Sequence, residues 1–214
     1  MSGQIDLYCE RTDFGLWSEP VNALTNLAFI LAGALLLVRL LRGRPGAGGS
    51  VAALPVLLML VGACSLAFHL LATVWAGWVD TLSILLFACV FLYAFFRVAG
   101  GASRALSLAA AIGFFALTFA TKLWAPDLRL NGSEVYLPMV LALFAMIAYL
   151  SRARELRMQF ALATAILLVS LTFRTIDAAV CAQFPLGTHF IWHLLNALVL
   201  YLLTAALMRR ALTQ

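Results

Sequence analysis

The sequence predicts an all-α, polytopic membrane protein: a bundle of seven transmembrane helices with its N-terminus outside and its C-terminus cytoplasmic. Its 214 residues are 64% hydrophobic and only 11% charged. A soluble globular domain has roughly 45–50% apolar and about 25% charged residues. Seven apolar stretches approach the length of about 20 residues that crosses the hydrocarbon core. Arginines gather in alternate loops, which predicts the orientation.

The apolar stretches divide the chain without a long linker, so we expect one domain over residues 1–214. Short segments such as "RGRPGAGGS" separate them. Residues 1–21 are acidic and have no apolar core, which favours an ordered extramembrane segment over a cleavable signal peptide. The predicted spans lie near 22–41, 51–74, 79–98, 105–123, 135–151, 158–179 and 187–208.

Basic residues set the predicted orientation, because cytoplasmic loops are enriched in Lys and Arg. An external N-terminus leaves only Arg11, Lys122, Arg129 and Arg174 outside. The net charge of +5 does not suggest nucleic acid, since the arginines lie in short loops rather than on one face. On the cytoplasmic side would be Arg39, Arg42, Arg44, Arg97, Arg104, Arg152, Arg154, Arg157, Arg209 and Arg210.

The three histidines of the chain are predicted to lie at one depth, in the outer third of the membrane. His189 and His193 are four residues apart and share a face at the start of the last span. His69 lies toward the outer end of the second span. Ionisable side chains inside a bilayer are costly and usually functional. Three histidines also match the ligand set of a catalytic zinc site with an open fourth position.

Two further polar residues accompany the histidines. Ser65 lies one turn before His69, and Asp80 is predicted to open the third span. A hydroxyl and a carboxylate beside a zinc site provide a hydrogen-bond donor and a proton acceptor for hydrolysis. The alternative is structural: buried histidines bonded to neighbouring hydroxyls or carbonyls, and Asp80 capping its helix.

The cysteines fall into two groups. Cys64 and Cys89 lie within spans and are expected to be small apolar fillers. Cys9 and Cys181 both lie on the predicted outer side, where disulfides persist, so we predict a bridge between them, with two unpaired thiols as the alternative.

Arg174 and Asp177 are a charged pair near the outer end of the sixth span. They are three residues apart, which predicts an ion pair within one helix. A link from this pair to the N-terminal segment or to Ser65 is the second possibility.

The motifs resemble the alkaline ceramidases. "SLAFH", followed eleven residues later by Asp80, and "THFIWH" in the last span are similar to that family, as are "YCERTDFGLWSEPVNALTN" and "RTIDAAVC". The resemblance covers nearly the whole chain. It implies that His69, His189 and His193 bind zinc, that Asp80 takes a proton from the attacking water, and that Ser65 stabilises the oxyanion.

The same resemblance implies a calcium site in the N-terminal segment, where carboxylate and carbonyl oxygens would be the ligands. The chain departs from the family by having Leu7 where the family has Asp, and by a shorter segment after Glu10. A solvated acidic segment is the alternative. The matching or replacing positions are Asp6, Tyr8 (through its carbonyl), Glu10, Asp13 and Glu19.

The sequence therefore predicts a zinc-dependent amidase that hydrolyses ceramide or a similar N-acyl lipid at the outer (periplasmic or lumenal) side. The bilayer and its lipids are the expected partners, with no nucleic acid and no obligate protein partner. A seven-helix receptor or signalling protein with a structural zinc, similar to the adiponectin-receptor-like proteins, is the alternative. Those proteins have the N-terminus inside, which the arginine distribution here argues against. A retinal protein would need a lysine in the last helix, and the only lysine is Lys122.

Overall fold

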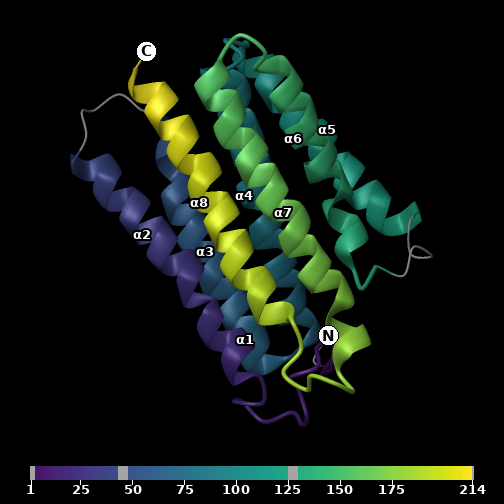
Figure 1. The fold of residues 1–214 in the computed structure, drawn as a ribbon. Coiled ribbons are helices and arrows are strands. Elements are labelled where there is room, and N and C mark those ends of the chain that lie inside the picture. Colours follow the sequence, from purple (N-terminus) through teal and green to yellow (C-terminus); the bar gives the residue numbers. More distant parts are fainter. Residues whose placement is uncertain (1–2, 43–47, 125–129, 214) are drawn as a thin grey trace.

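The computed structural model describes residues 3–42, 48–124 and 130–213, and its regular elements there are helices (Figure 1). Arg44 and Arg129, two of the charges used for orientation, lie outside these residues. The helices are α1 Pro20–Thr25, α2 Leu27–Arg42, α3 Gly49–Leu71, α4 Val74–Val98, α5 Arg104–Trp124, the 3-10 turn η2 Ser133–Tyr136, α6 Leu137–Tyr149, α7 Arg154–Val180 and α8 His189–Leu212.

Six helical segments are long and apolar enough to cross a membrane, with α1 and α2 together counting as one. Their exposed side chains include Leu31, Leu41 and Ile112, so apolar groups face outward as they do toward lipid. The predicted fifth span, 135–151, is shorter than expected. It consists of η2 and the 13-residue α6, which together run from Ser133 to Tyr149.

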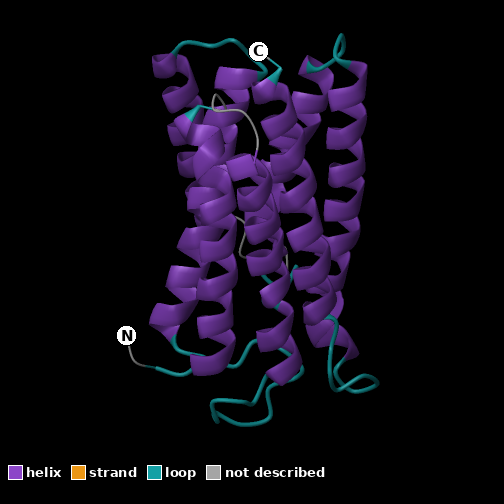
Figure 2. Ribbon diagram, turned by 90° about the vertical axis from the view of Figure 1, so that its left-hand side faces the viewer, coloured by secondary structure: helices purple, strands orange, loops and turns teal. Residues whose placement is uncertain are grey.

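The helices run alternately up and down, and they leave the two termini at opposite ends of the bundle (Figures 1 and 2). The N-terminal segment, the end of α3 and the start of α8 share one end. The described arginines assigned to the cytoplasmic side fall at the other end, for example Arg97 at the end of α4 and Arg209 at the end of α8. The arginines that the sequence analysis assigned to one side of the membrane therefore lie at one end of the bundle.

The first span is interrupted for one residue between α1 and α2. Asn26 lies at this break, is fully buried, and donates from its side chain to the carbonyl of Asn22. A side chain that bonds to the preceding turn can disturb the hydrogen-bond pattern of a helix at such a point. Gly62 on α3 allows close contact here, because a Cβ atom would lie 2.9 Å from the Asn26 carbonyl oxygen.

The turn between α3 and α4 is tighter than the sequence suggested. Ala72 adopts a left-handed backbone conformation, with φ of 46°, and α4 begins at Val74 rather than near residue 79. The N-terminal segment pairs with this turn through Ile5 N–H to the Ala72 carbonyl (2.8 Å) and Val74 N–H to the Gly3 carbonyl (3.0 Å). The segment is thereby held across the end of the bundle, beside His69.

Candidate metal centre

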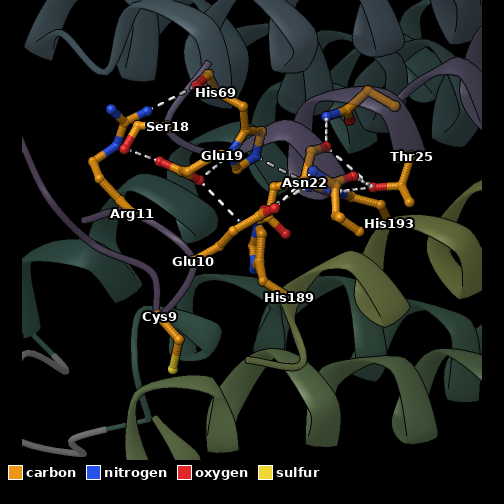
Figure 3. Close-up of polar contacts among 12 residues, drawn as sticks. Cys9, Glu10, Arg11, Ser18, Glu19, Asn22, Thr25, His69, His189 and His193 are labelled. Carbon is orange, nitrogen blue, oxygen red and sulfur yellow. Dashed lines mark hydrogen bonds and ion pairs between the residues drawn. The ribbon is translucent and has the colours of Figure 1, made fainter. Parts of the chain in front are cut away.

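The structure brings the three histidines together, as the sequence predicted. His69 lies in the last turn of α3, while His189 and His193 occupy the first two turns of α8. All three are buried, and one ligand-capable atom from each lies within 4.8 Å of the other two. The residues of the N-terminal segment and of α1 surround them (Figure 3).

Glu19 orients the imidazole of His69. Its Oε2 lies 2.6 Å from Nδ1 of His69. Because the carboxylate accepts this hydrogen bond, the proton belongs on Nδ1 and the lone pair on Nε2. Carboxylates behind ligand histidines are common in metal sites, where they fix the tautomer and the ring orientation.

Thr25 orients His193 in the same way. Its Oγ1 lies within donating distance of the carbonyls of Val21 (2.8 Å) and Asn22 (3.1 Å), and 3.0 Å from Nδ1 of His193. A hydroxyl that donates to either carbonyl accepts from Nδ1–H, which leaves the lone pair of His193 on Nε2 as well.

The two Nε2 atoms of His69 and His193 face each other at 3.2 Å. With both protons placed on Nδ1, the two lone pairs repel each other unless a cation lies between or beside them. His189 adds a third ring, whose Nδ1 is buried and has no hydrogen-bond partner. Three buried imidazoles, two of them held through Nδ1, offer the nitrogen donors that zinc prefers, so these residues fit the ion.

His189 is positioned by its ring neighbours and by its backbone. Its ring stacks on Tyr8, with centroids 3.6 Å apart, and on Trp192 at 5.0 Å. The N–H groups of Thr188 and His189 donate to Oδ1 of Asp177, at 2.6 and 2.9 Å. A carboxylate that accepts these otherwise unpaired amides fixes the first turn of α8.

Ser65 and Asp80 both lie beside the triad. Ser65 is one turn before His69 on α3, and Asp80 has Ser65 and His69 among its electrostatic neighbours. The Oγ of Ser65 and Oδ1 of Asp80 are buried without a hydrogen-bond partner. Asp80 does not cap its helix, because α4 begins at Val74 with Thr73 in the capping position. Unpartnered buried groups of this kind usually meet water, an ion or a ligand.

The predicted disulfide is present: Cys9 is bonded to Cys181, with Cα atoms 5.1 Å apart. Asp177 strengthens this link, because its Oδ2 accepts the N–H of Cys9 at 3.2 Å. The predicted ion pair between Arg174 and Asp177 is wrong. Arg174 instead donates to the carbonyl of Asn131, so the second possibility, a link from Asp177 to the N-terminal segment, is the observed one.

The carboxylates expected to bind calcium have hydrogen-bond partners within the protein or are exposed. Both carboxylate oxygens of Glu10 accept N–H groups at the start of α1, from Val21 (2.7 Å) and Asn22 (2.8 Å). Oδ1 of Asp13 accepts the N–H of Gly15 at 2.6 Å, and Asp13 is exposed, as is Asp6.

Tyr8 and Glu19, the other two candidates, are committed elsewhere. The Tyr8 carbonyl accepts the backbone N–H of Arg11 at 3.2 Å, and Glu19 pairs with His69 and with the guanidinium of Arg11. In the part of the chain that the structure describes, these groups therefore do not fit a calcium ion.

These hydrogen bonds and ion pairs, together with burial, also shift the pKa values of the carboxyl groups. Burial alone would raise the pKa of Glu19, but its contacts with His69 and Arg11 outweigh burial and hold the pKa below its usual value. The N–H of Gly15 and the Ser18 hydroxyl lower the pKa of Asp13. Burial raises the pKa of Glu10 despite its backbone hydrogen bonds.

An apolar cavity of about 170 Å³ lies between α4, α5, α6, α7 and α8. Phenylalanine and leucine side chains form most of its wall, including Phe91, Phe114 and Leu143. Asn196, one turn beyond His193, lines it too, as does Tyr136, whose ring centroid lies 6.0 Å from that of Trp192. The cavity therefore extends to the neighbourhood of the histidines.

Long apolar helices that bury three imidazoles at one end define a helical membrane protein with a candidate metal centre. Residues 5–213 match the family model named Ceramidase, so the chain belongs to the ceramidase family. The family confirms the resemblance seen in the sequence, and it implies a hydrolase that acts on amide bonds. No curated protein matches the chain in sequence.

The sequence interpretation did not assign Thr25, Arg11 or Asp177 to the site, and it gave Glu19 a different ion. Thr25 carried a faint signal, since it follows Asn22 by three residues at the start of a span. Arg11 carried one too, as a cation within an acidic segment on the side poor in arginine. Their partners lie 58 and 168 residues away in the chain, and no spacing rule reaches that far.

Proposed function

We propose that this protein is a zinc-dependent amidase that hydrolyses ceramide, or a similar N-acyl lipid, to a free long-chain base and a fatty acid. One observation carries the proposal: the Nε2 atoms of His69 and His193 converge at 3.2 Å, with the unpartnered polar atoms of Ser65 and Asp80 nearby. Membership of the ceramidase family supports the same reaction class.

His69, His189 and His193 would hold the zinc. When bound, zinc supplies a Lewis acid that polarises an amide carbonyl and lowers the pKa of water to about 7. The rings are oriented in advance, because Glu19 and Thr25 hold two of them through Nδ1. Little rearrangement is then needed when substrate binds.

Asp80 is the proposed proton acceptor of the reaction. Its unpartnered Oδ1 can take a proton from the attacking water and return it to the amine that leaves.

Ser65 is the proposed stabiliser of the oxyanion. Its hydroxyl is buried beside Asp80, so it can donate to the carbonyl oxygen of the substrate as negative charge develops there. A preformed donor costs little reorganisation at the moment of reaction.

The apolar cavity is the proposed site of the acyl chain. Its walls are formed almost entirely by apolar side chains, and it reaches Asn196, one turn from His193. A lipid could thus keep its tail among Phe91, Phe114 and Leu143 while its amide lies beside the triad. The proposed orientation, with the N-terminus outside, puts this reaction at the outer side of the membrane.

The test is release of fatty acid from a fluorescent ceramide by purified protein, paired with elemental analysis of zinc. We expect stoichiometric zinc and turnover in the wild type and loss of both in His193→Ala. Glu155→Ala, an exposed change at the opposite end of the bundle, is the matched control. Zinc without turnover on any N-acyl lipid tested would favour the receptor alternative.

A further inference from the structure

The side chain of Arg11 is buried inside the N-terminal segment, with a residue exposure of 5%. All three of its nitrogens donate. Nε lies 2.5 Å from Oε1 of Glu19, Nη1 lies 3.1 Å from the Asp13 carbonyl, and Nη2 lies 2.8 Å from the His69 carbonyl. One guanidinium therefore joins the segment, the residue before α1 and the last turn of α3.

The partners of Arg11 are of the kind that a calcium ion collects. Two are backbone carbonyl oxygens and one is a carboxylate oxygen, which are the ligands that hard cations take. A guanidinium is always charged and offers several donors in a fixed planar fork, so it can bind these oxygens permanently. A dication at Glu19 would also have to lie beside this positive charge, and like charges at such short range repel strongly.

Arg11 holds the metal ligand His69 at two points. It binds the backbone carbonyl of His69 directly, and it holds one oxygen of Glu19 while the other oxygen accepts from Nδ1 of His69 (Figure 3). Glu19 is only 3% exposed, and the side-chain amide of Asn22 also donates to its Oε2 at 3.1 Å. A change at Arg11 should therefore reach the metal centre through Glu19.

We propose that Arg11 is the resident cation of the N-terminal segment, in the role that the family resemblance gives to calcium, and that it orients His69 through Glu19 without any calcium ion. Arg11 is a positioning residue, since it contacts neither the metal position nor the substrate. The inference rests on the proposed zinc site at His69, His189 and His193.

The first test is calcium binding by the wild-type protein in detergent micelles. Equilibrium dialysis with radioactive calcium should find no stoichiometric ion up to about 10⁻³ M, the weakest class of protein calcium sites. The midpoint of thermal unfolding should not move over the same range. One bound calcium per chain, with a rise in the midpoint, would overturn the proposal.

The second test measures the metal centre of Arg11→Met and Arg11→Lys. Loss of an outer partner of a ligand histidine typically weakens metal binding about 10- to 100-fold, and we expect this for Arg11→Met. The visible spectrum of the cobalt-substituted protein should change as well. Arg11→Lys keeps the charge without the fork, so its zinc affinity should lie between those of Arg11→Met and the wild type.

Arg152→Met, an exposed arginine at the other end of the bundle, is the matched control and should leave both zinc affinity and the cobalt spectrum unchanged. A folded Arg11→Met protein with wild-type zinc affinity and spectrum would contradict the inference. If Arg11→Met does not fold, the calcium titration of the wild type and the spectrum of Arg11→Lys decide instead. Calcium binding, zinc affinity and the cobalt spectrum are all measured without ceramide. A failure of the proposed ceramide hydrolysis can therefore be distinguished from a failure of this inference.

Discussion

The hydroxyl of Thr25 lies 3.0 Å from Nδ1 of His193 and gives its own proton to the Val21 carbonyl. This pair joins α1 to α8 at the level of the proposed metal. When the hydroxyl donates to a carbonyl of α1, it accepts from the imidazole and selects the tautomer in which Nε2 is free to bind a metal.

Thr25→Val should therefore weaken zinc binding by about tenfold or more, because His193 loses the group that selects its tautomer. The change keeps the shape of the side chain. Competition with a calibrated zinc chelator would measure the dissociation constant. Thr172→Val, an exposed threonine on α7, is the matched control. Equal zinc affinity in the two variants would remove Thr25 from the metal centre.

Asp80→Asn and Ser65→Ala should lower kcat while the zinc content stays at the wild-type level. We expect a loss of about 10²–10⁴-fold for the proton acceptor. For the oxyanion donor we expect about 10²–10³-fold. Single-turnover rates with fluorescent ceramide and metal analysis of the same samples check this. Ser107→Ala on α5 is the control for loss of a buried hydroxyl. Loss of zinc in Asp80→Asn would mean that Asp80 acts on the metal.

The sequence predicted the triad correctly because its information is local. A spacing of four residues puts His189 and His193 on one face, and the helix rise places His69 at the same depth. In contrast, Glu19 and Thr25 reach their histidines only through the docking of α1 against α3 and α8. Their pairing spans 50 and 168 residues, and one sequence contains no signal for it.

The start of α4 and the partners of Asp177 also depend on the tertiary fold, and the sequence alone did not predict them. The start of α4 depended on a two-residue turn that Ala72 makes in a left-handed conformation, which is uncommon for alanine. Asp177 was predicted to bond within its own helix, yet it serves the first turn of α8 and the N–H of Cys9. The buried carboxylate of Asp177 accepts backbone N–H groups that have no other acceptor. Which N–H groups lie near it depends on the tertiary fold.

The disulfide should stabilise the fold and the start of α8. Replacing both Cys9 and Cys181 by serine should reduce the free energy of unfolding by about 2–5 kcal/mol, because the unfolded chain gains freedom. Thermal unfolding in micelles would measure the change. A thiol reagent should label only Cys64 and Cys89 of the denatured wild-type protein before reduction. Labelling of all four cysteines without reductant would contradict the bridge.

The proposed orientation predicts opposite accessibility of the two chain ends. Thr12, in the N-terminal segment, and Thr213, directly after α8, are both exposed, and these two parts of the chain lie at opposite ends of the bundle (Figure 1). In intact right-side-out vesicles, a membrane-impermeant maleimide should label Thr12→Cys, whereas Thr213→Cys should react only after the vesicles are lysed. The positive-inside bias is the physical reason. The reverse pattern would place the metal centre on the cytoplasmic side, and it would remove the argument against the receptor branch.

The cavity should determine which acyl chains are hydrolysed. Ala88 lies in α4 and lines the cavity, so Ala88→Phe would place a ring in the space proposed for the tail. Because a filled cavity excludes long chains first, kcat/KM for a long-chain ceramide should fall at least about tenfold more than for a short-chain ceramide. The short-chain substrate controls for damage to the metal centre in the same variant. An equal loss for both substrates would indicate a general disturbance of packing, and the acyl chain would then have to lie elsewhere in the bundle.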